Sequence, residues 1–352
     1  MPESVPDSLA QPRIRAAWYV ACRTEDLTRE PRGVTLFSVP IVLFRGADGA
    51  AAALLDRCPH RNVPLSQGTV VGGHLQCKYH GWRFHPDGRC VHIPAHTKSA
   101  DTPARRCTTI AVREQQGFVW IWGDPDHPPS TEPPQLSAGE RPGYLTVRRS
   151  LAVQGSIHAV AENALDVPHT AFLHRGLFRV DKERQPIECR IERWHDRVEC
   201  HFIGEPRPEG LAGRLLSPSG GTVSHVDRFR LPSIVEVEYQ IGSENHIILN
   251  GAITPHSDHD VTLHAVVSVR TRFPSWLLRP FVQPIALRIF AQDQHILRLQ
   301  TENMHRFNEA RFISTELDVL GPHILRLMRQ AARGDLDPPQ QQPYTRTVTM
   351  LL

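Results

Sequence analysis

Four potential metal ligands lie within residues 58–82, CPHRNVPLSQGTVVGGHLQCKYHGW. Cys58 and His60 form a Cys-x-His pair, and after sixteen intervening residues Cys77 and His80 form a Cys-x-x-His pair. Prolines and glycines lie between and beside the two pairs, and such residues allow the backbone to form tight loops. The stretch therefore predicts two facing loops that hold a metal centre between them.

Thiolate and imidazole ligands suit either a tetrahedral zinc ion or a [2Fe–2S] cluster of the Rieske kind. A zinc finger normally places two cysteines on one arm and two histidines on the other, whereas each arm here carries one of each. Mixed arms suit a cluster in which one iron binds both cysteines and the other binds both histidines. We therefore expect Cys58, His60, Cys77 and His80 to bind a [2Fe–2S] cluster, with zinc as the alternative.

The first part of the chain, residues 13–125, shows short runs of alternating apolar residues separated by turns such as Pro86-Asp87-Gly88. This pattern predicts an all-β domain. Residues 123–136, GDPDHPPSTEPPQL, contain five prolines, which neither pair in a central strand nor continue a helix. We expect a proline-rich linker over residues 126–140.

Beyond the linker, the pattern changes to a mixture of helix and strand. Alternating residues predict strands, and two stretches have helical periodicity. The predicted fold class is α+β, with a second domain over residues 141–337 and a loosely held tail over residues 338–352. The predicted strands are 234–239, 246–253 and 261–269, and the predicted helical stretches are 157–173 and 274–312.

A second group of ligand types occurs in residues 162–176, ENALDVPHTAFLHRG, as Asn163, Asp166, His169 and His174. On a regular helix the first three share one side and His174 does not, so the helix must bend or end. Pro168 supplies the reason. Two histidines on such a distortion can converge on one metal, and a set of two histidines and one carboxylate leaves coordination positions open for dioxygen.

The carboxylate has to come from elsewhere, and Asp293 is the candidate. It is a lone acid among apolar residues on the long helical stretch. Residues 255–260, PHSDHD, also resemble a metal site, but their composition favours a solvated turn between strands. Other acids downstream remain open as alternatives, namely Asp258, Asp260, Glu302 and Glu309.

Charge and composition exclude several classes of protein. With 40 basic and 37 acidic residues, the net charge of +3 indicates no nucleic-acid partner. The most apolar long stretch, residues 276–291, is too short and too interrupted to span a membrane. The N-terminus lacks the pattern of an export signal, and the seven scattered cysteines suit a reducing compartment. We therefore expect a cytoplasmic protein.

With both motifs in this order, residues 13–335 resemble the oxygenase component, or alpha subunit, of the Rieske non-haem iron oxygenases, also called aromatic-ring-hydroxylating oxygenases. The resemblance implies an N-terminal Rieske domain followed by a helix-grip (START-like) catalytic domain, in which an antiparallel sheet wraps a long C-terminal helix. It also implies a cyclic homotrimer.

By the same resemblance, His169, His174 and Asp293 bind a mononuclear Fe(II), and Asn163 lies close to it. Asp166 links His169 to the cluster ligand His80 of a neighbouring subunit. The chain has no flavin or nicotinamide fingerprint, so electrons come from a separate NAD(P)H-dependent reductase, with or without an intermediate ferredoxin.

The resemblance implies that O₂ is used to oxidise a small apolar substrate that is aromatic, steroid-like or tetrapyrrole-like. Monooxygenation, demethylation and desaturation are the expected outcomes. Residues 203–225, rich in glycine and proline, are expected to form a lid over the substrate. The alternative is a Rieske electron-transfer protein that has no catalytic iron.

Overall fold

The computed structural model describes residues 10–139, 141–175, 185–206, 223–242, 245–271 and 275–351. Most of the lid predicted at residues 203–225 lies outside these ranges. Two compact units are present: Ile14–Gln135 together with Thr254–Ser257 form the N-terminal unit, and the rest of the chain forms the C-terminal unit. The predicted linker, residues 126–140, straddles this division.

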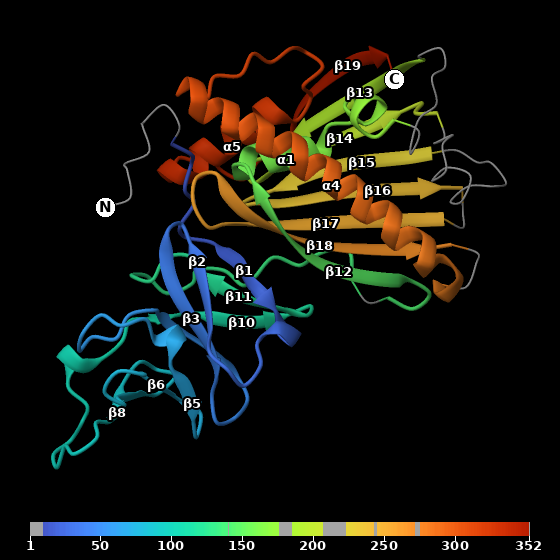
Figure 1. Ribbon diagram of the computed structural model, residues 1–352. Helices are drawn as coiled ribbons and strands as arrows, with labels where there is room; N and C mark the ends of the chain where they lie inside the picture. The colour runs from blue at the N-terminus through green and yellow to red at the C-terminus, as the bar shows by residue number, and fades with distance from the viewer. Residues whose placement is uncertain are drawn as a thin grey trace. The chain divides into compact units, whose positions relative to one another are not determined.

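The N-terminal unit is built from three small antiparallel sheets, as expected for an all-β domain. Their strand orders are β1-β11-β10, β2-β3-β4-β9 and β5-β6-β7-β8 (Figure 1). The strands are β1 (Trp18–Arg23), β2 (Arg32–Leu36), β3 (Val39–Arg45), β4 (Ala51–Leu55), β5 (Thr69–Val71), β6 (His74–Gln76), β7 (Arg83–Phe84), β8 (Cys90–His92), β9 (Thr109–Ile110), β10 (Val112–Gln115) and β11 (Phe118–Trp122).

A continuous apolar core lies under the two Cys/His loops. Phe44, Leu54 and Phe84 are fully buried in it, and Cys58 and Cys77 belong to the same cluster. Because the cysteines are anchored in this close-packed interior, the positions of both loops are set by the surrounding strands.

The C-terminal unit contains one eight-stranded antiparallel sheet in the order β12-β18-β17-β16-β15-β14-β13-β19 (Figure 1). Buried residues alternate with exposed residues along β13 and with half-buried residues along β14, as expected for strands that cover a core on one side. The strands are β12 (Leu145–Gln154), β13 (Pro186–Arg193), β14 (Arg197–Ile203), β15 (Val223–Arg230), β16 (Ile234–Ile241), β17 (Asn245–Pro255), β18 (Asp260–Arg270) and β19 (Tyr344–Leu351).

Helices α1 (Ile157–Leu165), α4 (Ser275–Phe307) and α5 (Gly321–Arg333) lie on one face of this sheet (Figure 1). Helix α4 packs against β12, whereas α1 packs against β15, β16 and both other helices. The sheet with its long helix confirms the predicted α+β architecture. Within the described residues, no helix is long and apolar enough to cross a bilayer.

The break expected near Pro168 is present. Ser156 caps the start of α1 by accepting a hydrogen bond from the Ala159 N–H at 3.1 Å, and α1 ends at Leu165. A four-residue helix, α2 (Thr170–Leu173), follows immediately. The residue before a proline is disfavoured in helical conformation, so the chain changes direction between Asp166 and Pro168.

Two segments differ from their expected character. The predicted tail carries β19, which pairs with β13 along eight residues and forms one edge of the sheet. The turn at residues 255–260 is not solvated throughout, because Asp258 and His259 are buried. Asp258 accepts two hydrogen bonds from the Arg13 guanidinium, at 2.9 and 3.1 Å. This pairing gives Asp258 a structural role in the fold.

Candidate metal centres and active site

The two Cys/His loops of the N-terminal unit repeat one backbone pattern. The N–H of Cys58 bonds the carbonyl of Val63, and the N–H of Cys77 bonds the carbonyl of Trp82, five residues on in each case. In the first loop the N–H of Asn62 bonds the carbonyl of Cys58, and in the second the N–H of Gly81 bonds the carbonyl of Cys77. Both residues have a positive φ, 59° for Asn62 and 71° for Gly81. Asparagine and glycine are the residues that tolerate this conformation.

The four predicted cluster ligands are split between the core and the surface. Cys58 and Cys77 are each 2% exposed. His60 is half-buried and stacks on Trp82, with ring centroids 4.7 Å apart, while His80 is exposed, with its ring centroid 4.6 Å from that of His60. The loops therefore present two buried sulfurs and two outer imidazoles.

This arrangement fits a two-iron cluster better than a single ion. Among the described residues, no three of these four side chains have ligand atoms within 4.8 Å of one another, as one tetrahedral ion needs. Burial raises the pKa of the Cys58 thiol to about 11, so a thiolate here needs a bound metal. A cluster that binds sulfur on its inner side and nitrogen on its outer side satisfies both observations.

In the C-terminal unit, His169, His174 and Asp293 converge, and all three ligand atoms lie within 4.8 Å of one another. The Nε2 atoms of the two histidines are 3.2 Å apart. Asp293 Oδ1 lies 3.1 Å from His174 Nε2 and 3.7 Å from His169 Nε2. The break after α1 brings the histidines together, and α4 supplies the carboxylate.

The polar atoms at this point are incompletely satisfied. Asp293 Oδ1 is buried and has no properly aligned hydrogen-bond donor. Two imidazole nitrogens lie 3.2 Å apart beside this carboxylate oxygen, so three atoms able to bind a metal share one small space. A cation relieves this arrangement, and the donor set suits ferrous iron with open positions.

A polar group lies at the Nδ1 atom of each histidine ring. Gln292 Oε1 accepts a hydrogen bond from His174 Nδ1 at 2.9 Å, so Nδ1 carries a proton and Nε2 is the atom on the side of Asp293. Asp166 Oδ2 lies 3.3 Å from His169 Nδ1, on the opposite side of that ring from Asp293, without an aligned hydrogen bond. Burial works against charge on His174, but the facing Asp293 and Gln292 outweigh it and raise the pKa. The site is therefore electrostatically suited to a cation.

A cavity of about 280 Å³ adjoins the three residues. It lies between the sheet and α4, and most of its wall consists of apolar side chains, including Val237, Leu249, Leu263, Ile289 and Phe290. A mainly apolar, concave site beside a few converging polar groups is typical of small-molecule binding. The arrangement can hold an organic molecule next to a metal.

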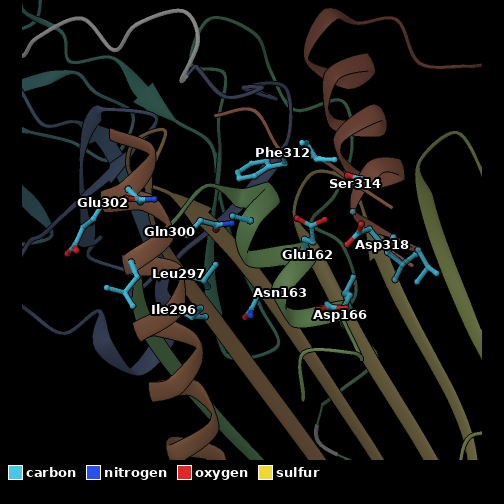
Figure 2. Close-up of a pocket in the computed structure, with 18 of the residues that line it drawn as sticks. Glu162, Asn163, Asp166, Ile296, Leu297, Gln300, Glu302, Phe312, Ser314 and Asp318 are labelled. Atoms are coloured by element: carbon cyan, nitrogen blue, oxygen red, sulfur yellow. The ribbon is translucent and has the colours of Figure 1, made fainter. Parts of the chain in front are cut away.

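A larger cavity, of about 730 Å³, has α1 residues such as Glu162 in its wall (Figure 2). Its wall includes residues of α4 and of the segment that leads into α5, and Asn163 and Asp166 line both cavities. The converging histidines do not line it, so the smaller cavity is the candidate active site.

Two groups near the histidines were not predicted from the sequence. One is Gln292, and the other is a polar cluster that lines the smaller cavity, Glu205, His225, Asp227 and Tyr239. One feature of the sequence could have indicated Gln292, namely its position next to the predicted ligand Asp293 on the same helix. The cluster had no comparable signal, because its residues come from three separate segments.

Comparison with known proteins agrees with both halves of the chain. The model of the Rieske [2Fe–2S] domain matches residues 17–112, and that of the vanillate O-demethylase oxygenase C-terminal domain matches residues 153–334. The second match covers the α1 break, the converging histidines and α4.

Relatives match over most of the chain. The dicamba O-demethylase oxygenase component of Stenotrophomonas maltophilia is 39% identical over 290 residues, which cover 82% of this chain and 75% of that protein. The vanillate O-demethylase oxygenase subunit of a Pseudomonas strain is 26% identical, covering 89% and 93%. A crystal structure of dicamba monooxygenase bound to dicamba matches with a TM-score of 0.78 at 25% identity, covering 92% and 98%. The chain belongs to the Rieske non-haem iron oxygenases, as an oxygenase component with a Rieske [2Fe–2S] cluster and a non-haem iron.

Proposed function

We propose that His169, His174 and Asp293 bind the mononuclear iron, that Cys58, His60, Cys77 and His80 bind the cluster, and that the enzyme demethylates a small aromatic ether. The observation that carries the proposal is the convergence of two imidazole nitrogens and an otherwise unsatisfied carboxylate oxygen beside an apolar cavity. The iron, when bound, supplies the activation of dioxygen.

The side chains around the iron have separate roles in this proposal. Gln292 fixes the ring orientation of His174 through a hydrogen bond, and Asp166 lies 3.3 Å from His169 Nδ1, where it favours a proton on that nitrogen. Apolar residues from the sheet and α4 exclude water and would hold the substrate ring beside the iron bound by His169, His174 and Asp293. Asn163, which lines both cavities, limits access to the iron from the side of the larger cavity.

The size of the cavity favours one of the expected substrate classes. About 280 Å³ suits a compact single-ring molecule better than a steroid or a tetrapyrrole. Two of the relatives are named for O-demethylation, of dicamba and of vanillate. Removal of a methyl group from an aromatic ether therefore fits the cavity better than the other outcomes. Electrons come from a separate reductase, and the protein acts in the cytoplasm.

Electron transfer between the two centres is assigned to Asp166. In the proposed homotrimer, Asp166 accepts hydrogen bonds from His169 of its own subunit and from His80 of the neighbouring subunit. Its carboxylate is partly exposed, at 35% for the side chain, so one oxygen is accessible to a partner. A ring of three subunits is the closed assembly that such head-to-tail contacts produce.

The test is Asp166→Asn in the full-length protein with both metals bound. Iron content and the visible cluster spectrum should match the wild type, while turnover with a surrogate reductase should stop. Product should be measured by mass spectrometry over a panel of methoxy-aromatic compounds, with steroids and tetrapyrroles as competitors.

The control is Glu162→Gln, which removes another acid of the same helix region that does not face either histidine. It should retain turnover. Normal product formation by Asp166→Asn would refute the bridging role. An Asp166→Asn protein that is inactive because it lacks the mononuclear iron would instead assign Asp166 to metal binding.

A further inference from the structure

The wall of the smaller cavity contains a polar cluster that the proposed reaction does not use, namely Glu205, His225, Asp227 and Tyr239. His225 and Asp227 are two residues apart on β15 and so share one face of the sheet. Tyr239 lies opposite His225 on β16, and Glu205 follows the end of β14. His225 is 2% exposed and Asp227 is 1% exposed, so the cluster is part of the interior.

Both nitrogens of the His225 ring face carboxylates. Nδ1 is 2.6 Å from Glu205 Oε2, and Nε2 is 2.9 Å from Asp227 Oδ1. The ring is also held between Phe202 and Tyr239, with centroids 4.4 and 3.8 Å away. Packing on two sides and hydrogen bonds at both nitrogens fix this ring in one orientation.

The two contacts define the charge of the cluster. A carboxylate is an acceptor only, so an imidazole between two carboxylates carries a proton on each nitrogen. Burial opposes the positive charge, but Asp227 and Glu205 outweigh it and raise the pKa of His225 to about 9. Burial raises the pKa of Asp227 against the opposing attraction of His225. With both carboxyl groups ionised around one imidazolium, the cluster has a net charge of one negative unit.

One carboxylate of the cluster has unfilled acceptor positions. Tyr239 O–H donates to Glu205 Oε1 at 3.5 Å and both N–H groups of His225 are used, whereas within the described part of the chain Asp227 has no hydrogen-bond donor besides His225. The neighbouring Arg228 points to the other face of the sheet, where it pairs with Glu199, Glu236 and Glu238. A buried carboxylate with unfilled acceptor positions is costly, and a ligand that supplies a donor removes this cost.

We propose that the cavity selects substrates bearing a hydrogen-bond donor, either a neutral hydroxyl or N–H group or an ammonium group, and disfavours aromatic carboxylates. The inference rests on the proposed function for its reaction, but its physical basis is the cluster itself. A substrate carboxylate would meet Asp227 and Glu205 in an interior that contains little water to screen the repulsion. The apolar remainder of the cavity then holds the ring, and the donor group determines which end faces the cluster.

Three matched probes test the proposal: 3-methoxybenzylamine, 3-methoxybenzyl alcohol and 3-methoxybenzoate. Their dissociation constants should be measured by calorimetry on the full-length, iron-loaded enzyme without a reductase. A hydrogen bond to a charged group is worth about 1.5–3 kcal/mol, so the amine and the alcohol should bind about 10- to 100-fold more tightly than the benzoate.

Substitution of the cluster should narrow this difference. We expect Asp227→Asn to reduce the ratio to within about threefold, because it removes a negative charge and adds a donor. Glu205→Gln should act in the same direction and serves as a second variant if Asp227→Asn folds poorly. The matched control is Glu238→Gln, which removes one charge from the opposite face of the same sheet and should leave the ratio unchanged.

Tighter or equal binding of the benzoate to the wild type would overturn the proposal, as would undetectable binding of all three probes. A ratio that survives both cluster substitutions would overturn it as well. The reaction is judged separately by adding a reductase. If the amine and the alcohol bind more tightly than the benzoate but no probe is demethylated, the proposed reaction is wrong and the proposed substrate selection stands. If the benzoate binds best and is demethylated, the proposed reaction stands and the proposed substrate selection is wrong.

Discussion

Replacement of Glu162 by glutamine should stabilise the protein at alkaline pH. Glu162 lies on α1 at the wall of the larger cavity, where its carboxyl group faces Asp318 and packs against Gly321 (Figure 2). Burial, followed by repulsion from Asp318 and Asp166, raises its pKa from 4.5 to about 7. The folded protein therefore binds a proton at Glu162 that the unfolded chain releases more readily.

The linkage between proton binding and folding gives the sign and the size of the change in unfolding free energy with pH. Because the pKa is raised in the folded state, the stabilisation is complete below pH 4.5 and is lost as pH rises through about 7. One pKa unit corresponds to about 1.4 kcal/mol, which gives a loss of roughly 2.5 kcal/mol between pH 5 and pH 8. Partial solvent exposure and the nearby N-terminus of α5, which favours an anion by about 0.3–1 kcal/mol, reduce the expected loss to about 1.5–2 kcal/mol.

The measurement is urea unfolding of wild type and Glu162→Gln at pH 5 and pH 8, followed by near-ultraviolet circular dichroism. The variant should gain about 1.5–2 kcal/mol of unfolding free energy relative to wild type between the two pH values. Glu302→Gln is the control, because Glu302 lines the same cavity but is exposed and pairs with Arg298. If the difference between Glu162→Gln and wild type is the same at both pH values, the raised pKa is refuted.

Three further substitutions test other parts of the structure. Gly81→Ala should lower cluster occupancy, because Gly81 has a φ of 71° and an added Cβ would lie 2.9 Å from Pro94 Cγ. The occupancy is measured as visible absorbance per chain. The control Gly49→Ala has a similar φ but no close neighbour at the added Cβ, and it should keep the cluster. Asp293→Ala should lose one iron per chain by elemental analysis and all turnover, and retention of that iron would exclude Asp293 as a ligand. Ile324→Ala, at a fully buried position on α5, should cost about 2–5 kcal/mol in urea unfolding, and a loss below about 1 kcal/mol would contradict its place in the core.

Local chemistry made much of this protein predictable from its sequence. The Cys/His loops are short, and their hydrogen bonds close within five residues, so ligand types, glycines and spacing specify the loop without the rest of the chain. The same holds for the break at Pro168, because a proline restricts its immediate neighbours whatever the tertiary context. Alternating residues likewise predicted β16, β17 and β18 closely.

The positions of groups far apart in the chain were decided by the tertiary structure. Sequence favoured Asp293 as the carboxylate ligand but left other downstream acids open, whereas the structure places Asp293 of α4 beside His169 and His174. The polar cluster around His225 could not be predicted from the sequence. Alternation along a strand identifies its two faces but does not show which face borders a cavity. Residues 344–351 follow a proline-rich turn and were predicted to be part of a tail. They form a strand because β13 supplies their backbone hydrogen bonds, and this partner cannot be identified from the local sequence. Sequence by itself determined the chemistry of each short segment, and only long-range packing determined which segments act together, since that packing depends on contacts between residues far apart in the chain.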